Sequence, residues 1–219
     1  MHTSVFLKNL IVIIICFVAM QLNGQVTLGI RTGYTMAWKA NVTWDDDEEY
    51  IHHGGFQASL LSYFDISNTL SLGLEPGFVQ RITSFQVGGS FGQLEERVLL
   101  NYFELPAMVS AKYPLWSDRW EMNVKAGYGF GILLSAFRES IFLTGGDPNE
   151  TRGFGNKVDH SRIFDVDHGL HGGIGIAYKI DNSRLFLETA YYMGFQDVSQ
   201  FNPSKNRSVH LGAGYRIVL

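Results

Sequence analysis

The sequence predicts an all-β fold, an eight-stranded antiparallel up-and-down transmembrane β-barrel with short periplasmic turns and longer extracellular loops. From residue 25 onward, apolar residues alternate with small or polar residues at a period of two, the pattern of strands with one apolar face. The alternating segments number eight, and the connections between them are short and long in turn. Barrels of the bacterial outer membrane have an even number of strands and the same rhythm of connections.

The first 24 residues have the order of a secretory signal peptide. Lys8 precedes an apolar run over residues 10–20, and polar residues follow that run. The run is about half of the ~20 residues that a membrane-spanning helix needs, so a cleaved signal is favoured over a retained anchor. Cys16, the only cysteine, lies within it. We therefore expect a signal peptide over residues 1–24 and one barrel domain, without disulfides, over residues 25–219.

The eight strands follow from the alternation taken segment by segment. In the first segment, large apolar residues that begin at Val26 share one face, and small or charged residues that begin at Thr27 share the other. The last segment repeats this pattern. The predicted strands cover residues 25–39, 55–64, 69–84, 98–113, 120–137, 165–180, 185–195 and 207–219.

The connections predict which end of the barrel faces outward. Three short ones are rich in turn-forming residues and are expected in the periplasm, together with the start of the mature chain. They cover residues 65–68, 114–119 and 181–184. The long ones hold most of the Asp, Asn, Gly and His residues and are expected outside. They cover residues 40–54, 85–97, 138–164 and 196–206.

A soluble barrel or sandwich is the alternative, and it would turn the apolar faces inward. Two features favour the membrane. Aromatic residues gather at strand ends, as in the girdles of membrane barrels; they are Tyr34, Trp38, Tyr113, Trp120 and Phe137. The opposite faces are rich in glycine, as a narrow lumen requires. Because lipid offers no hydrogen-bond partner, such strands must close into a ring without free edges.

Six ionisable residues fall on the predicted lumen faces, near the middle of their strands. Three are basic and three acidic: Arg31, Glu75, Glu104, Lys125, Glu188 and Arg216. The lumen of an eight-stranded barrel is filled by side chains, so we expect these charges to form a paired structural network. Glu104 with Lys125, and Glu188 with Arg216, are the candidate pairs on adjacent strands. A gated channel or a proton path is the alternative interpretation.

An acidic segment in the first long connection suggests a metal site. Asp45, Asp46, Asp47, Glu48 and Glu49 supply oxygen ligands of the kind that calcium and magnesium prefer, with His52 and His53 close by. Their spacing matches no recognised ligand set, and a run of like charges is usually solvated. We therefore expect neither a metal nor another cofactor.

Histidine, aspartate and serine residues near the sixth strand suggest a hydrolase or an acyltransferase. Asp165, Asp167, His168 and His171 lie there, and His160 and Ser161 precede them. Their spacing matches no nucleophile motif, and His171 shares the lumen face with glycines, where a structural histidine is the simpler interpretation. We therefore expect no catalytic residues.

The fourth predicted strand resembles the PorT-like outer-membrane β-barrel family of small OmpA-like barrels. The resemblance is carried by Tyr102-Phe103-Glu104-Leu105-Pro106 and extends to Leu187-Glu188-Thr189-Ala190-Tyr191-Tyr192 and to Gly212-Ala213-Gly214-Tyr215-Arg216-Ile217. It covers essentially the whole chain, although Leu219 stands where such barrels commonly end in an aromatic residue. It implies a location in the outer membrane of a Gram-negative bacterium.

Three functions are compatible with these patterns. The first is a non-enzymatic structural or surface-interaction role, with outer-membrane lipid around the barrel and a possible protein partner at the extracellular loops. The second, implied by the resemblance, is an accessory component of a protein secretion system. The third is a small outer-membrane enzyme acting on lipid or peptide. A nucleic-acid partner is not expected, because the formal net charge is −4 and the basic residues are scattered.

Overall fold

A computed structural model describes residues 25–40, 48–51, 54–89, 92–143, 151–157, 165–198 and 204–219. The predicted signal peptide, residues 1–24, lies outside this range and stays a prediction. Among the described residues there is no helix long and apolar enough to cross a bilayer.

The described secondary structure consists of β-strands. In chain order they are β1 (Val26–Ala40), β2 (Glu48–Ile51), β3 (Gly54–Asp65), β4 (Leu70–Leu74), β5 (Gly77–Gly89), β6 (Gly92–Pro114), β7 (Trp120–Leu143), β8 (Thr151–Lys157), β9 (Val166–Ile180), β10 (Ser183–Asp197) and β11 (Lys205–Val218).

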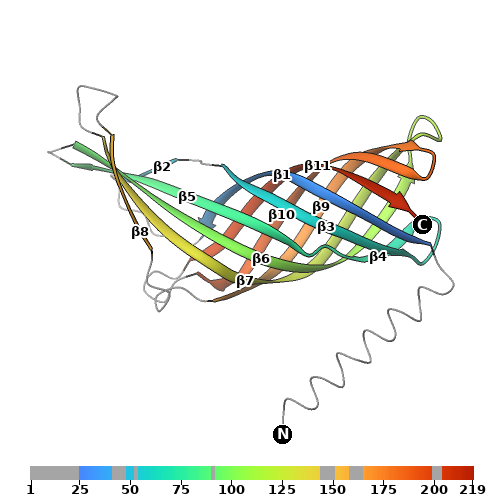
Figure 1. The fold of residues 1–219 in the computed structure, drawn as a ribbon, viewed down its shortest axis with the longest axis horizontal. Coiled ribbons are helices and arrows are strands. Elements are labelled where there is room, and N and C mark those ends of the chain that lie inside the picture. The colour runs from blue at the N-terminus through green and yellow to red at the C-terminus, as the bar shows by residue number, and fades with distance from the viewer. Residues whose placement is uncertain are drawn as a thin grey trace, which may run out of the picture.

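These strands close into the predicted antiparallel barrel. β1 pairs with β3 on one side and with β11 on the other, so the first and last strands meet. Around the ring the order is β1, β3, β4 with β5, β6, β7, β9, β10 and β11. β4 and β5 occupy one position in the wall, so the wall has the eight positions that the alternation predicts (Figure 1).

The third predicted strand, residues 69–84, is interrupted. β4 ends at Leu74 and β5 begins at Gly77, which leaves Glu75 and Pro76 between them. Proline has no N–H to donate to a ladder. The wall stays joined through single bonds, from Leu60 N to Pro76 O at 2.9 Å and from Glu75 N to Pro106 O at 3.0 Å.

Three predicted loops are partly strands, those over residues 40–54, 85–97 and 138–164. β5 and β6 run through most of residues 85–97, and β7 continues to Leu143 inside the predicted loop 138–164. β8 pairs with residues 137–143 of β7, and β2 pairs with residues 84–87 of β5. The prediction was wrong there because it required one apolar face. An antiparallel sheet need not have one wholly apolar face, and the residues of these segments do not alternate in that way.

The outward faces of the wall are apolar over a band that ends in aromatic or polar residues. Toward the chain termini the band ends near Tyr113, Trp120 and Tyr178, with the Trp120 and Tyr178 ring centroids 5.0 Å apart. Toward the other end, Gln80 Nε2 donates to Asn101 Oδ1 at 3.1 Å. The sheet built from β2, β5, β6, β7 and β8 continues the wall beyond this boundary, away from the C-terminus (Figure 1).

Candidate functional site

The lumen holds the six predicted charged residues. Arg31 is on β1, Glu104 on β6, Lys125 on β7, Glu188 on β10 and Arg216 on β11. Glu75 stands on the two-residue break between β4 and β5. All six side chains are buried inside the barrel.

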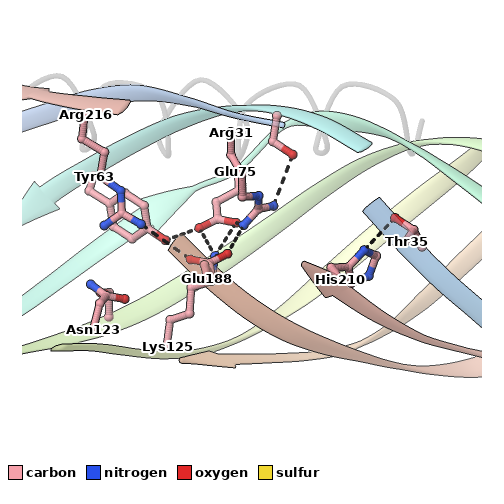
Figure 2. Close-up of polar contacts among 11 residues, drawn as sticks. Arg31, Thr35, Tyr63, Glu75, Asn123, Lys125, Glu188, His210 and Arg216 are labelled. Carbon is pink, nitrogen blue, oxygen red and sulfur yellow. Dashed lines mark hydrogen bonds and ion pairs between the residues drawn. The ribbon is translucent and has the colours of Figure 1, made fainter. Parts of the chain in front are cut away.

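Five of the six form an inner cluster: Arg31, Glu75, Lys125, Glu188 and Arg216. Arg31 Nη1 lies 2.8 Å from Glu75 Oε2 and 2.6 Å from Glu188 Oε1. Lys125 Nζ lies 2.8 Å from Glu75 Oε1 and 2.7 Å from Glu188 Oε1. Arg216 Nη2 lies 3.7 Å from Glu188 Oε2, the predicted pair of adjacent strands. Each carboxylate is therefore shared between cations that come from different sides of the ring (Figure 2).

Hydroxyl and aromatic groups complete the inner cluster. The Tyr63 hydroxyl donates to Glu75 Oε1, and Arg31 Nη2 donates to Ser59 Oγ at 3.2 Å. The Arg216 guanidinium lies over two rings, 5.4 Å from the centroid of Tyr63 and 4.2 Å from that of Phe186. Stacking on aromatic faces stabilises a buried guanidinium in addition to its ion pair.

The lumen end toward the chain termini is filled by an apolar group. Its members are Leu61, Tyr63, Met108, Ala177 and Phe186. The group needs the glycines that face it, because a Cβ added to Gly214 would collide with the Phe186 ring. Glycine on the lumen face thus makes room for a large side chain from the neighbouring strand.

The sixth predicted residue belongs to a separate outer cluster. Glu104 pairs with Arg81, whose guanidinium lies 5.1 Å from the Tyr102 ring centroid and 4.3 Å from that of Tyr192. Asp167, also buried, accepts from Asn206 Nδ2 at 2.8 Å. We define the outer cluster as Arg81, Glu104 and Asp167, with the rings of Tyr102 and Tyr192.

The predicted pair of Glu104 with Lys125 was wrong, although β6 and β7 are adjacent. In the ladder Lys125 lies opposite Ser110, and Glu104 lies opposite Gly131. Six residues separate Glu104 from Ser110 along β6, which corresponds to about 20 Å of strand. Arg81 is closer to Glu104 along the strands than Lys125 is. Gly77 lies opposite Glu104, and Arg81 follows Gly77 on β5 by only four positions.

Two histidines lie between the clusters. His210 Nδ1 is 3.0 Å from Thr35 Oγ1, and its Nε2 is 2.9 Å from Ser208 Oγ. The ring of His171 lies 4.7 Å from that of Tyr192. A cavity of about 20 Å³ remains beside them, bordered by residues of both clusters. A cavity of that size holds about one water molecule.

The end of the lumen away from the termini is closed by a second apolar group. It consists of Leu100, Tyr102, Leu133, Ala136 and Val198, with Val98 packed against it. Val198 follows β10, and its N–H donates to Ser204 O at 2.7 Å. In the part of the chain that the structure describes, the charged clusters are therefore enclosed between apolar groups at both ends.

A recess marks the mouth of the barrel at the turns beside the termini. Glu121 lies 3.2 Å from Lys179 Nζ and 2.9 Å from Arg184 Nε. Asp65 Oδ1 lies 2.6 Å from Lys112 Nζ. These charges border an open recess of about 320 Å³. Each of them has an oppositely charged neighbour, so the recess presents no unpaired cation or anion among these residues.

The candidate catalytic residues of β9 do not meet at one site. Asp167 and His171 point into the lumen, whereas His168 lies among outward rings, with its Nδ1 2.5 Å from the Tyr128 hydroxyl. Asp165 is exposed at the start of the strand. His160 and Ser161 lie outside the described residues. Consecutive residues of a strand point to opposite faces, which separates His168 from its neighbours.

The candidate metal residues fall mostly outside the described range. Asp45, Asp46, Asp47, His52 and His53 are among the residues that the structure does not describe. Glu48 and Glu49 belong to β2, for which the pairing of the backbone is described. Elsewhere in the described ranges, no group of three His, Cys, Asp or Glu side chains could hold a metal ion.

Arg81 and Asp167 are buried lumen residues that are not among the six predicted charges. Arg81 has the same parity as Glu75, so the alternation already places both on one face. Asp167 has the parity of His171, so the alternation places it on the lumen face as well. No signal in the sequence indicated that Glu104 would pair with Arg81, because that depends on the register between β5 and β6.

The sequence matches a known protein family. The model of a family described as outer membrane protein beta-barrel domain matches residues 20–200. No curated protein sequence matches the chain.

Several solved structures are similar to the chain. Neisserial surface protein A is 14% identical with a TM-score of 0.48, and the match covers 89% of this chain and 99% of that one. OprG from Pseudomonas aeruginosa is 11% identical with a TM-score of 0.46, over 87% of this chain and 95% of that one. A major outer membrane protein from Thermus thermophilus is 13% identical with a TM-score of 0.46, over 89% and 99%.

Proposed function

This chain belongs to the outer membrane protein beta-barrel domain family, and we propose that it is a closed, non-enzymatic barrel whose outward sheet serves surface interactions. Its partners are the lipid of a Gram-negative outer membrane and a protein met at the cell surface. The signal peptide over residues 1–24 brings it there.

The unequal length of the strands is the main support for this proposal. β6 has 23 residues and β7 has 24, whereas β1, β3, β9, β10 and β11 have 12 to 15. About 9–11 residues are enough for a tilted strand to cross a bilayer. The additional residues support an extracellular sheet that includes β2 and β8, and a surface of this kind is suited to binding a partner.

The filled lumen supports the closed, structural part of the proposal. Two charged clusters, stacked rings and two apolar groups occupy the interior, and the cavity between them has room for about one water molecule. Such an interior favours a mechanical role for the charges over conduction. Purified protein in a planar bilayer should therefore show no stable channel, and a stable open pore would contradict this part.

The secretion-accessory role remains a second interpretation with less support. The motif that suggested it, residues 102–106, serves the barrel itself. Tyr102 and Glu104 fill the lumen, whereas Phe103 and Leu105 face outward. The positions of residues 102–106 in the barrel wall explain their residue types, so no secretion partner is needed to account for the motif. Co-purification of a secretion complex with the chain would favour this second interpretation.

The orientation of the outward sheet has a direct test. The mature chain has no cysteine if the signal peptide is removed, so single cysteines report position. We expect Asn156→Cys in β8 to react with a membrane-impermeant maleimide on intact cells. Ser117→Cys, in the turn between β6 and β7, should react only after the outer membrane is permeabilised. The reverse pattern would refute the proposed orientation and the surface role with it.

A further inference from the structure

β8 is the last strand at one end of the sheet. It pairs with β7 along one edge, and no other described strand pairs with its second edge. The β7–β8 register is continuous over seven residues, and β8 contains no proline. A strand of this kind presents a row of N–H and C=O groups that can pair with another strand. β2, at the opposite end of the sheet, has only four residues.

The central part of β8 is symmetric about its middle residue, and each flank carries one basic and one neutral polar residue. The strand reads Thr-Arg-Gly-Phe-Gly-Asn-Lys, with Phe154 at the centre and a glycine on each side. In an antiparallel pair of two such strands centred on Phe154, Arg152 is opposite Asn156, and Thr151 is opposite Lys157. No like charges are opposed, and an aromatic pair stands at the centre, which is favourable between strands. A parallel pair in the same register would oppose Arg152 to Arg152 and Lys157 to Lys157.

We propose that the edge of β8 that no described strand covers pairs antiparallel with β8 of a second copy of this chain. The inference rests on the proposed function, because β8 is available to another copy only if the outward sheet lies at the cell surface. It deepens that function by naming the partner and the mode of contact. The contact is isologous, since the same strand is used on both sides of a two-fold axis.

The geometry of such a pair fixes how the two barrels are arranged. Two identical strands that continue one sheet in antiparallel fashion are related by a two-fold axis perpendicular to the sheet. The sheet continues the barrel wall along the long axis of the molecule (Figure 1), so this axis is close to the plane of the membrane. Rotation about it turns the second barrel upside down. The two copies therefore belong to opposing membranes, and the contact joins two cells or two vesicles.

Vesicle clustering tests this arrangement. Purified mature protein is incorporated into two populations of phosphatidylcholine vesicles that carry different fluorophores, and clustering is followed at physiological salt. Asn156→Arg opposes Arg152 with a like charge at two places in the pair, and we expect clustering to fall about tenfold. Asn156→Asp is the matched control, and it should keep or increase clustering because it opposes Arg152 with an opposite charge. Equal clustering by the two variants, or none by the unaltered protein, would overturn the proposal.

A disulfide tests the register independently of charge. Phe154→Cys brings two cysteines opposite each other at the two-fold axis, within the distance that a disulfide spans. Under mild oxidation we expect a cross-linked dimer with one chain from each vesicle population, distinguished by tags of different mass. Ser117→Cys should give none. Cross-links confined to one population would refute the contact between opposing membranes. Heat-modifiable gel mobility checks that each variant is folded.

Labelling on intact cells separates the failure of this inference from failure of the proposed function. If Phe154→Cys reacts with an impermeant maleimide and does not cross-link, and the unaltered protein does not cluster vesicles, β8 is at the surface and only the pairing is wrong. If the residue stays unlabelled until the outer membrane is permeabilised, the surface role itself fails.

Discussion

The inner and outer clusters both hold charged side chains inside the barrel, but they stabilise these charges with different numbers of ion pairs. In the inner cluster Glu188 contacts three cations, and Glu75 contacts two. In the outer cluster one cation, Arg81, pairs with Glu104 and lies between two rings. A buried charge is tolerated only when it is paired and hydrogen-bonded. The inner cluster therefore depends on shared carboxylates, and the outer cluster depends on one guanidinium.

The two clusters connect different sets of strands in the barrel wall. The inner cluster draws on β1, β7, β10, β11 and the break between β4 and β5, and thus connects strands on both sides of the junction where β1 meets β11. The outer cluster draws on β5, β6, β9 and β10 and does not span this junction. We infer that the inner cluster contributes more to keeping the ring closed.

Replacement of the most connected carboxylate should have the largest effect. Glu188→Ala leaves Arg31, Lys125 and Arg216 with only Glu75 as a counter-ion, so we expect a loss of about 3–5 kcal/mol in the free energy of unfolding. Urea titration in detergent micelles, read by gel mobility without boiling, measures it. Thr189→Ala, on the outward face of the same strand, is the control and should cost much less. Equal losses would contradict the importance of the inner cluster.

Removal of the outer guanidinium should have the next largest effect. Arg81→Ala leaves Glu104 and Asp167 buried without their cation and removes the contacts with two rings, so we expect a loss of about 3 kcal/mol. Arg81→Lys restores the charge but lacks the planar group that stacks. It should recover part of the loss in the same titration. Full recovery would show that the stacking is unimportant.

A double-mutant cycle tests whether the two clusters are separate. Glu75→Gln and Lys125→Met alter partners in contact, so their effects on unfolding should be coupled by about 1–3 kcal/mol. Glu75→Gln and Arg81→Met belong to different clusters and share no partner among the described contacts. Their effects should add to within about 0.5 kcal/mol. Strong coupling in the second cycle would mean that the clusters act as one network.

An ion pair in the extended strands should matter least. Arg138 pairs with Glu96, and more than half of the Arg138 side chain is exposed. Exposed pairs contribute about 0–1 kcal/mol because water and salt screen them. Arg138→Ala should therefore leave the unfolding curve almost unchanged. A loss as large as that of Arg81→Ala would mean that this region is covered in the native state.

Residue patterns along the chain predict the fold class, the faces of most residues in the barrel wall and all six lumen charges named above. The physical reason is that residue parity along a strand decides which way a side chain points, and parity is local. Short turns are local as well. Asp181, which has a positive φ of 51° between β9 and β10, is of a residue type that tolerates this conformation. Turn-forming residues therefore predict the short turns without any information on strand pairing.

Which charges meet is set by the tertiary structure. Glu104 pairs with Arg81 and not with Lys125, because the register between strands separates residues that alternation treats as neighbours. It also decided where the wall breaks at Glu75 and Pro76, and that β2 and β8 extend it outward. Register, closure and strand addition depend on hydrogen bonds between segments far apart in the chain. No pattern within a single strand encodes them.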